Sequence, residues 1–488
     1  MKLSLSQEKA KYLILNFLKS YESSNNFFIL EGSAGTGKST LITNILEDTT
    51  FSNKKIVYSA TTNKAVSILK KYSHNPEKYS FCTIHKLLNI KRTINNTGKE
   101  IYDVTLDNEN IKVKSIYQYD IIIIDEASMI SQGLLSKLIN ILNKIKGKII
   151  FLGDPAQLPP VNESNSLIFY TKNIPRFKLK EIMRYKGKII DLCDEVRNLV
   201  FKPEYKIKFN DFKCNEINLQ KNFEKTIIRF INFIEKKKKP IYLVYTNKQC
   251  DFINSKIREY IFSNTKNKYE ENDIILFNNF YQSPRGIFYY TSHQFIIHNI
   301  KINTLIFKPM NLDKVLNSFK IKYTDDFINL KNSNIEIKNE KDLTILFNVL
   351  FSELKNKHFN IYELTLNNND IIQTIHESDI DSYNYFINDI KEKIKEINSY
   401  VFKKYKRCKI LTQLISYIWS YFYQNYIDIL ADINYGYCIT THKSQGSNYK
   451  SVFVDMKDII TNNSNKLESY RCLYTAITRT TKYLNIYM

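Results

Sequence analysis

The sequence predicts an α/β protein whose sheets are parallel. Three short apolar runs support this prediction, "FFIL" at 27–30, "IIIID" at 121–125 and "KIIFLG" at 148–153, because each has the length and composition of a buried strand. The first run leads through a glycine-rich loop into "STLITNIL", whose apolar residues recur at helical spacing. The order strand, loop, helix is that of an α/β unit with a parallel sheet.

The length and charge of the chain limit what it can be. With 488 residues it exceeds what a single hydrophobic core usually serves, so we expect two or more domains. Its 71 Lys and Arg outnumber 49 Asp and Glu, and the net charge of +22 favours a polyanion as partner, nucleic acid before a membrane surface. The alternative is codon bias, since the chain is also rich in Asn, Ile and Tyr, as an A+T-rich genome would encode.

The cysteines and the N-terminal segment argue against several classes of protein. The seven cysteines are scattered without a CxxC pair, which disfavours a zinc site or a disulfide framework. The first residues, "MKLSLSQEKAKY", lack the apolar core of a secretion signal, and no run approaches the ~20 apolar residues of a membrane-spanning helix. We therefore expect an intracellular protein without membrane contact, in the cytoplasm, the nucleus or a viral factory.

The segment "EGSAGTGKST", at 31–40, matches the phosphate-loop pattern Gly-x-x-x-x-Gly-Lys-[Ser/Thr]. Glycines in such a loop let backbone N–H groups turn toward phosphates, and Lys38 supplies a positive charge for the β and γ oxygens. The hydroxyl of Ser39 would bind Mg²⁺. The sequence thus predicts a site for ATP and Mg²⁺ formed by Gly32, Ser33, Ala34, Gly35, Thr36, Gly37, Lys38, Ser39 and Thr40.

Acidic and amide residues at two strand ends would complete this site. Asp125 and Glu126 follow the apolar run "IIII", at a position where two acids rarely serve packing. We expect Asp125 to bind Mg²⁺ through its water shell, and Glu126 to polarise the attacking water as a general base. Gln157, in "GDPAQLPPV", is placed to sense the γ-phosphate, while the prolines of this loop fix a rigid turn.

Several further segments occur together with these in a recognisable order, and their order and spacing resemble those of superfamily 1 helicases. The resemblance is closest to the 5′-to-3′ branch that includes RecD and the phage Dda helicase, and it covers residues 1–250 and 430–488. It implies two RecA-like domains that sandwich ATP and bind single-stranded DNA, in a monomer that acts on DNA forks alongside replication or recombination proteins. The added segments are "ATTNKAV", "TIHKLL", "LVYTN", "THKSQGS" and "LYTAITRT".

The resemblance also assigns roles to individual residues near the nucleotide. Gln7 would read the adenine ring, because an amide can pair with both a donor and an acceptor. Arg184 in "LKEIMRY" would reach the γ-phosphate, and Arg479 in "LYTAITRT" would be the arginine finger from the second domain. Gln445 and Gly446 lie where the family couples the nucleotide state to the grip on DNA. The alternatives are a solvated glutamine at a helix start for Gln7 and surface arginines for the other two.

The DNA contacts implied by the resemblance are short polar side chains at strand ends. Hydroxyl and amide groups can grip phosphates without reading bases, as a translocating protein requires. For His85 and His442 the alternative is a histidine satisfied within the core. The predicted contacts are Thr61, Thr62, Asn63, Lys64, Thr83 and His85 in the first domain and Thr440, Thr441, His442, Lys443 and Ser444 in the second.

We predict a two-domain chain with an insertion. The first RecA-like domain spans residues 1–187, and the second is formed by residues 188–270 and 431–488. Residues 271–430 form an inserted accessory subdomain. Its beginning, "NDIILFNNFYQSPRGIFYY", has the strand character expected of the small β-barrel that the family often carries there.

Two smaller elements have alternative readings. Polar and apolar residues alternate around "NNTG" and predict a β-hairpin insertion at 91–114. By resemblance this hairpin would carry the pin that separates DNA strands, and the alternative is a hairpin that only widens the DNA channel. In "ILTQLISYIWSYFYQNYIDIL", helical spacing around Trp419 predicts a packed helix rather than a base-stacking platform.

The leading hypothesis from the sequence is an ATP-dependent DNA helicase that translocates on single strands from 5′ to 3′. One rival is an RNA helicase, because superfamily 1 also contains RNA motors and no residue clearly reads a 2′-hydroxyl. A rival from another class is a non-catalytic nucleic-acid-binding protein on a decayed helicase scaffold. Retention of Lys38, Asp125, Glu126, Gln157 and Arg479 argues against decay.

Overall fold

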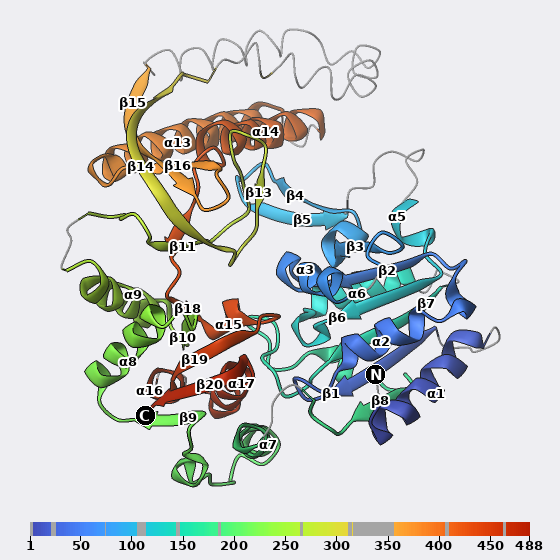
Figure 1. The fold of residues 1–488 in the computed structure, drawn as a ribbon. Helices are drawn as coiled ribbons and strands as arrows, with labels where there is room; N and C mark the ends of the chain where they lie inside the picture. Colours follow the sequence, from blue (N-terminus) through green and yellow to red (C-terminus); the bar gives the residue numbers. More distant parts are fainter. Residues whose placement is uncertain are drawn as a thin grey trace. The chain divides into compact units, whose positions relative to one another are not determined.

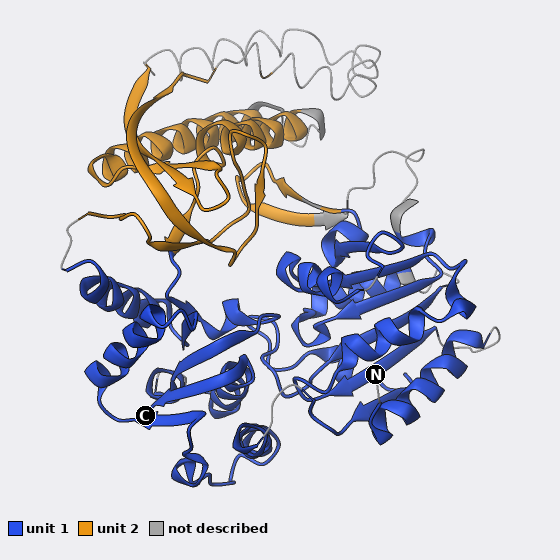
Figure 2. Ribbon diagram, viewed as in Figure 1, with its two compact units in different colours: residues 1–89, 106–266, 435–488 blue, residues 90–105, 267–434 orange. Residues whose placement is uncertain are grey.

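The computed structural model divides the chain into two compact units, each assembled from segments that are separated in the sequence (Figure 2). Unit 1 contains residues 1–89, 106–266 and 435–488, and unit 2 contains residues 90–105 and 267–434. The residues that the structure describes are 3–20, 26–73, 75–104, 114–142, 147–183, 187–263, 267–310, 315, 356–405, 409–461 and 465–488.

The first part of unit 1 is a six-stranded parallel sheet with the order β3-β2-β6-β7-β1-β8 (Figure 1). The strands predicted from the apolar runs, β1, β6 and β7, are mostly buried, and the side chains of Ile122, Ile123 and Ile124 are 0% exposed. The edge strands β3 and β8 are more exposed. The strands are β1 Phe27–Gly32, β2 Ile56–Ala60, β3 Ser80–Thr83, β6 Ile121–Asp125, β7 Lys148–Gly153 and β8 Arg176–Leu179.

The second part of unit 1 is a five-stranded parallel sheet with the order β18-β10-β19-β20-β9. Strands from both sides of the insertion contribute to it, because β9 and β10 precede unit 2 and the other three follow it. The two parallel sheets confirm the predicted α/β class. The strands are β9 Ile217–Gln220, β10 Pro240–Val244, β18 Cys438–Thr440, β19 Tyr449–Asp455 and β20 Thr480–Tyr487.

Helices connect the strands of both sheets. Three of them, α1 to α3, bury apolar residues such as Ile14, Leu41 and Leu69 in one core with strands β1, β2, β6 and β7. The helices of unit 1 are α1 Leu5–Lys19, α2 Lys38–Leu46, α3 Asn63–Tyr72, α4 Ile84–Leu87, α5 Lys114–Tyr117, α6 Gln132–Leu142, α7 Lys188–Phe201, α8 Phe223–Glu235, α9 Asn247–Ile261, α15 Thr441–Ser444, α16 Met456–Thr461 and α17 Lys466–Ile477.

Threonine side chains begin four of these helices directly after a parallel strand. The hydroxyl oxygens of Thr62, Thr83, Thr246 and Thr440 accept backbone N–H groups in the first turns of α3, α4, α9 and α15. A hydroxyl that accepts such a bond satisfies one of the unpaired donors of a helix start. It keeps its own proton for a further acceptor.

Unit 2 is built on an antiparallel sheet with the order β16-β15-β14-β11-β17. Strands β14 and β15 form a long, curved antiparallel pair (Figure 1), which runs from Phe307 opposite Lys357 to Ile297 opposite Leu366. The strands are β11 Ile274–Phe277, β14 Gln294–Phe307, β15 Lys357–Leu366, β16 Ile371–Ile375 and β17 Ile433–Tyr435, with the short pair β12 Tyr281–Gln282 and β13 Phe288–Tyr289.

Two long helices, α13 Ile380–Tyr405 and α14 Lys409–Phe422, run side by side in unit 2 (Figure 1), and a π-helical turn, Tyr423–Ile427, extends α14. Trp419 lies in α14 and is 2% exposed, so the prediction of a packed helix is confirmed. It belongs to an aromatic and aliphatic core that also contains Phe307 and Phe386.

The predicted hairpin insertion is present, and it groups with unit 2. Strand β4 Ile90–Ile94 pairs with β5 Glu100–Val104 around a turn that contains Gly98. The indole Nε1 of Trp419 donates to the carbonyl oxygen of Asn96 at 3.2 Å, and the Tyr423 hydroxyl donates to that of Gly98 at 3.4 Å. The hairpin tip is therefore held by α14 and its extension. The remainder of the predicted hairpin segment, residues 105–113, lies outside the described residues.

Candidate active site

The phosphate loop lies between strand β1 and helix α2, where the sequence predicted it. Gly35 and Gly37 have positive φ angles of 84° and 78°, which other residues rarely adopt. The backbone angle favours glycine at position 37, and a Cβ atom there would also lie 2.8 Å from Nε2 of Gln7 and displace that amide. The loop leads into the start of α2, where backbone N–H groups suit an anion.

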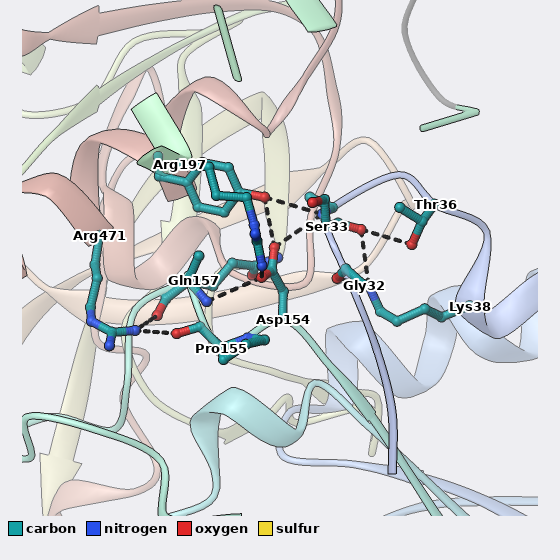
Figure 3. Close-up of polar contacts among 12 residues, drawn as sticks. Gly32, Ser33, Thr36, Lys38, Asp154, Pro155, Gln157, Arg197 and Arg471 are labelled. Carbon is teal, nitrogen blue, oxygen red and sulfur yellow. Dashed lines mark hydrogen bonds and ion pairs between the residues drawn. The ribbon is translucent and has the colours of Figure 1, made fainter. Parts of the chain in front are cut away.

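The polar side chains of the loop bond to its own backbone. Nζ of Lys38 donates to the carbonyl oxygens of Gly32 at 2.8 Å and Ser33 at 3.1 Å (Figure 3). Oγ1 of Thr36 also donates to the Ser33 carbonyl, at 2.9 Å. These bonds keep the ammonium group within the loop that it is predicted to serve.

Gln7 is buried against the phosphate loop rather than solvated, with 1% of its surface exposed. Its Nε2 donates to the carbonyl oxygen of Thr36 at 3.1 Å, while its Oε1 accepts from the backbone N–H of Ser4 at 3.0 Å in a capping box. The start of α1 is thus tied to the loop. The adenine-reading role of Gln7 stays a prediction.

The predicted metal-binding pair is in direct contact. Oγ of Ser39 donates to Oδ2 of Asp125 at 2.6 Å, and Oδ1 of Asp125 accepts the backbone N–H of Glu126 at 2.7 Å. A hydroxyl and a carboxylate are oxygen ligands of the kind that Mg²⁺ prefers, with waters and substrate phosphates as its further ligands. The described residues contain no cluster of three or more His, Cys, Asp or Glu suited to a metal.

Glu126 has a backbone conformation that is unusual for a side chain of its kind. Its φ of 52° and ψ of 43° lie in the left-handed region, directly after the strand β6. Non-glycine residues in that region cost free energy and are often found at functional sites. The turn directs the chain away from the sheet immediately after Asp125, which agrees with the predicted role of Glu126 as general base without testing it.

Asp154, directly after β7, accepts four hydrogen bonds, which come from the phosphate loop, from helices α7 and α17 and from its own loop. Its Oδ2 accepts the backbone N–H of Ala34 in the phosphate loop at 3.1 Å and the hydroxyl of Tyr474 in α17 at 2.7 Å. Its Oδ1 accepts the backbone N–H of Ala156 at 3.1 Å and Nη2 of Arg197 in α7 at 3.3 Å (Figure 3). This carboxylate therefore links the phosphate loop to two helices that belong to the second part of unit 1.

The loop after Asp154 is held through its backbone. Arg471 of α17 donates to the carbonyl oxygens of Pro155 and Gln157 (Figure 3). The backbone N–H of Leu158 donates to Oγ1 of Thr475 at 3.0 Å, and its carbonyl oxygen accepts Nε2 of Gln445 at 3.0 Å. Residues around the second sheet therefore contact the loop that carries Gln157.

The side chain of Gln157 is 5% exposed, and its Oε1 has no hydrogen-bond partner among the described residues. A buried carbonyl oxygen without a donor is costly. A water or a protonated group of a ligand in this position would satisfy it. The predicted role as γ-phosphate sensor remains a prediction.

Of the two predicted nucleotide-binding arginines, Arg479 lies within the described residues and Arg184 does not. Arg479 is 2% exposed, and it donates to the carbonyl oxygens of Thr475 at 3.1 Å and Ser447 at 3.3 Å and to the Thr478 hydroxyl at 3.2 Å. It is therefore not a surface arginine, and these partners all belong to the second part of unit 1. Arg184 lies outside the described residues.

The predicted DNA contacts of the first sheet follow strands β2 and β3. Thr62 and Thr83 are the helix-capping threonines described above, and Thr61 donates to Sδ of Met129 at 3.5 Å. Asn63 is exposed at the start of α3. Nζ of Lys64 donates to the hydroxyl of Tyr449 in β19 at 3.2 Å, so it does not project freely into solvent.

The predicted contacts around the second sheet lie in and after α15. Thr441 is buried and donates to the carbonyl oxygen of Val244 at 3.1 Å, and Ser444 donates to that of Thr441 at 2.7 Å. Lys443 is half-buried. Gly446 has a φ of +70°, and a Cβ atom on it would lie 3.3 Å from Cβ of Ala65 in α3. The segments predicted to grip DNA from the two sheets are thus neighbours.

Both predicted histidines are partly buried and tend to be neutral. Burial lowers the pKa of His85, and nearby Lys137 lowers it further. Burial also lowers the pKa of His442, against the opposing effect of Glu468. Neutral imidazoles can donate a hydrogen bond without adding charge, so these histidines suit positioning contacts better than charge pairing with phosphates.

Sequence reasoning missed Arg197, Arg471 and Tyr474. Arg471, Tyr474, Thr475 and Thr478 lie three or four residues apart, so they share one face of the buried helix α17 and its end. That stripe of polar residues within an otherwise apolar stretch was the available signal. Arg197 offered none, because a single arginine in a helix is usually solvated.

Two family models match the chain. An AAA domain matches residues 16–198, and a UvrD-like helicase C-terminal domain matches residues 435–487. They correspond to the first sheet with its flanking helices and to the last strands of the second sheet. The described helices include none with the length and hydropathy needed to cross a bilayer.

Curated relatives extend over nearly the whole chain. The uncharacterized protein R530 of Acanthamoeba polyphaga mimivirus is 32% identical over 505 aligned residues, which cover 96% of this chain and 97% of the relative. RecBCD enzyme subunit RecD of Buchnera aphidicola subsp. Schizaphis graminum is 27% identical and covers 95% of this chain and 70% of its own length. ATP-dependent DNA helicase dda of Enterobacteria phage T4 is 27% identical over 51% of this chain and 56% of its own length.

Among solved structures, the Pif1 helicase from Bacteroides in complex with ADP-AlF3 and ssDNA aligns over 99% of this chain and 92% of its own, with 14% identity and a TM-score of 0.49. The assignment to a family rests on the sequence relatives and the family models, and not on this structural similarity. Since a relative at 32% identity aligns over 96% of this chain, and RecD, dda and the two family models match it as well, the chain belongs to the superfamily 1 helicases, in their 5′-to-3′ branch.

Proposed function

We propose that this helicase couples ATP hydrolysis to 5′-to-3′ translocation on single-stranded DNA and so unwinds duplexes at forks. The proposal rests on hydrogen bonds that side chains of α17 and of the C-terminal end of α15 make with the loop after β7. Gln445 and Thr475 bond to the backbone of Leu158, in the loop whose Asp154 accepts the backbone N–H of Ala34 in the phosphate loop. Nucleotide chemistry at the first sheet can thereby move elements of the second, which a motor requires.

In ATP hydrolysis, each predicted site residue around the first sheet has one task. Water adds to the γ-phosphorus, the bond to the β–γ bridging oxygen breaks, and ADP and phosphate leave. Glu126 takes the proton of the water, Lys38 offsets charge on the β and γ oxygens, and Gln157 orients the reacting group. Mg²⁺, held through Ser39 and Asp125, would neutralise phosphate charge when bound.

Residues outside the first sheet would complete the nucleotide site. Gln7 would read the adenine edge beside Thr36, with which it already bonds. Arg479 would reach the γ-phosphate as the arginine finger, because a guanidinium is permanently charged and bidentate. For Arg184 the sequence resemblance alone supports a contact with the same phosphate.

On the DNA side, three helix starts support a contact with the phosphate backbone. Helix starts attract phosphates, and the capping hydroxyls of Thr62, Thr83 and Thr440 keep a proton to donate. Contacts of this kind hold a strand without reading its bases. A monomer acting inside the cell in replication or recombination fits such an activity and the virus and phage origin of two relatives.

A turnover assay tests the proposal. ATP hydrolysis by the full chain should rise at least tenfold when single-stranded DNA is added, and a DNA duplex with a single-stranded overhang should be unwound in the presence of ATP and Mg²⁺. Stimulation by RNA but not by DNA would replace the proposal with an RNA helicase. Nucleic-acid binding without any ATP hydrolysis would replace it with a binding protein.

A further inference from the structure

The carboxylate of Asp154 is almost completely enclosed. Its side chain is 0% exposed, and that of its ion-pair partner Arg197 is 11% exposed. Burying a carboxylate is costly unless a cation and several hydrogen bonds compensate it. Here the compensation comes from Arg197, the Tyr474 hydroxyl and two backbone N–H groups.

The donors to Asp154 come from parts of the chain that have different tasks. The N–H of Ala34 belongs to the phosphate loop, whereas Arg197 and Tyr474 belong to α7 and α17, which pack against each other. The same Tyr474 hydroxyl accepts the Ala34 N–H at 3.4 Å. A shift of α17 relative to the first sheet would therefore change the hydrogen bonds of the phosphate loop directly.

We propose that Asp154 relays the position of α7 and α17 to the phosphate loop, with Tyr474 and Arg197 as positioning residues for ATP turnover. This inference rests on the proposed function, because it assumes that the loop binds ATP. Neither residue acts on the phosphates in this scheme. They fix Asp154, which fixes the backbone at Ala34 and hence the direction of the N–H groups that follow in the loop.

The two positioning residues have separable effects. Arg197 neutralises Asp154, and an uncompensated carboxylate beside the loop would repel the phosphates of ATP. Its loss should therefore weaken ATP binding and raise KM. Tyr474 carries no charge, so the loss of its hydroxyl should leave KM little changed and lower kcat, since only the link to α17 is broken.

The test compares Tyr474→Phe with Tyr470→Phe in the full chain. Tyr470 lies in the same helix, is half-buried, and its hydroxyl has no partner among the described residues. Tyr474→Phe should lower the DNA-stimulated kcat about tenfold with KM for ATP within twofold of the parent, and Tyr470→Phe should match the parent. Equal rates for Tyr474→Phe and the parent, or an equal loss in Tyr470→Phe, would overturn the inference.

Arg197 provides the second arm. Arg197→Gln should raise KM for ATP at least tenfold, and Arg197→Lys, which keeps the charge, should recover most of the affinity. If Arg197→Gln keeps the parent KM, the proposed neutralisation is wrong. Should Arg197→Gln or Tyr474→Phe lose its cooperative thermal unfolding, Arg197→Lys decides: a KM for ATP at least tenfold above that of the parent would contradict the proposed neutralisation, because lysine keeps the positive charge beside Asp154.

A DNA-free measurement separates this inference from the proposed function. If the parent shows no DNA-stimulated hydrolysis, the helicase proposal fails, but binding of a non-hydrolysable ATP analogue still reports on the loop. The radius of gyration from X-ray scattering should fall when the analogue saturates the parent and should fall less in Tyr474→Phe. Identical changes in the two proteins contradict the relay, whatever the DNA experiment shows.

Discussion

The parallel sheets of unit 1 and the insertion of unit 2 use their side chains in opposite ways. In unit 1, polar groups at strand ends bond across elements, as Ser39 does with Asp125 and Tyr474 with Asp154. In unit 2, aromatic rings fill the core, and the ring of Phe307 lies 5.6 Å from that of Phe359 and 6.0 Å from that of Tyr426. We therefore expect single polar atoms to control turnover in unit 1 and side-chain volume to control stability in unit 2.

The largest effect should follow a change in unit 1 at Arg479. If this residue stabilises the transition state, Arg479→Ala should still bind ATP but lose roughly 10³-fold in DNA-stimulated turnover, about 4 kcal/mol. Lys38→Ala should weaken ATP binding as well, because we expect its ammonium group to contact the phosphates already in the ground state. Nucleotide affinity and turnover of both variants check the pair.

The burial of Arg479 requires a stability control for that experiment. Its bonds to Thr475 and Ser447 would be lost together with its charge, so the melting temperature of Arg479→Ala must be compared with that of the parent. Turnover within tenfold of the parent would mean that another arginine is the finger. Arg184, and Arg471 with its contacts to the loop after β7, would then be the candidates.

In unit 2, Trp419→Ala should lower the free energy of unfolding by about as much as Arg479→Ala raises the barrier to ATP hydrolysis. Removing a fully buried tryptophan typically costs about 3–5 kcal/mol, because a cavity remains. Trp419 is 2% exposed and also bonds to the hairpin tip. Circular dichroism in urea should show the loss, while DNA-free ATP hydrolysis of the folded variant stays within twofold of the parent. Trp419→Phe, which keeps an aromatic ring in the core, is the matched control. A tenfold loss of DNA-free hydrolysis in Trp419→Ala would show that side-chain volume in unit 2 also controls turnover.

A smaller effect should distinguish steric overlap from backbone strain at two glycines of unit 2. Gly98 and Gly286 have similar φ angles of +79° and +83°. A Cβ atom on Gly98 would lie 2.7 Å from the Trp419 ring, whereas on Gly286 the nearest atom is 3.9 Å away. Each alanine should cost about 1–2 kcal/mol for the left-handed backbone, and Gly98→Ala a further 1–3 kcal/mol for overlap.

Trp419 is the only tryptophan of the chain, so its fluorescence during urea unfolding measures both glycine variants directly. Gly98→Ala should also change the emission of the folded protein, because the new methyl group touches the indole. Equal unfolding midpoints for the two variants would show that the hairpin tip is not held against α14.

The smallest expected effect, counted for each contact with a phosphate, is the salt dependence of the DNA affinity of unit 1. If Lys, Arg and helix starts contact phosphates, the logarithm of affinity should fall linearly with the logarithm of salt concentration, by about 0.7 per phosphate neutralised on single strands. Affinity should vary little with base sequence. A flat salt response would show that the net charge of +22 reflects codon usage rather than DNA binding.

Much of unit 1 could be predicted because its strands are short and apolar and end in polar motifs. The runs at 27–30 and 121–125 are buried parallel strands, and Ser39 meets Asp125 as their places in the motifs implied. The cross-links of Asp154 could not be predicted, since they depend on how α7 and α17 pack. A sequence pattern gives spacing along one helix but not the partner of its polar face.

Unit 2 was less predictable for a different physical reason. The hairpin around "NNTG" was visible as alternation with a turn signal, and Trp419 as part of a helical stripe. Strand β14 has mostly exposed residues along its 14 positions, so it lacks the apolar run of a buried strand. Its partner β15 begins 50 residues after β14 ends, and a pairing over such a separation leaves no local signal.

Duplex unwinding with tailed substrates tests whether this chain moves along DNA in one direction. Two substrates are built from the same duplex with a single-stranded tail of equal length at either the 5′ or the 3′ end. With ATP and Mg²⁺, we expect rapid unwinding from the 5′ tail and little from the 3′ tail. Equal or faster unwinding from the 3′ tail would contradict this expectation.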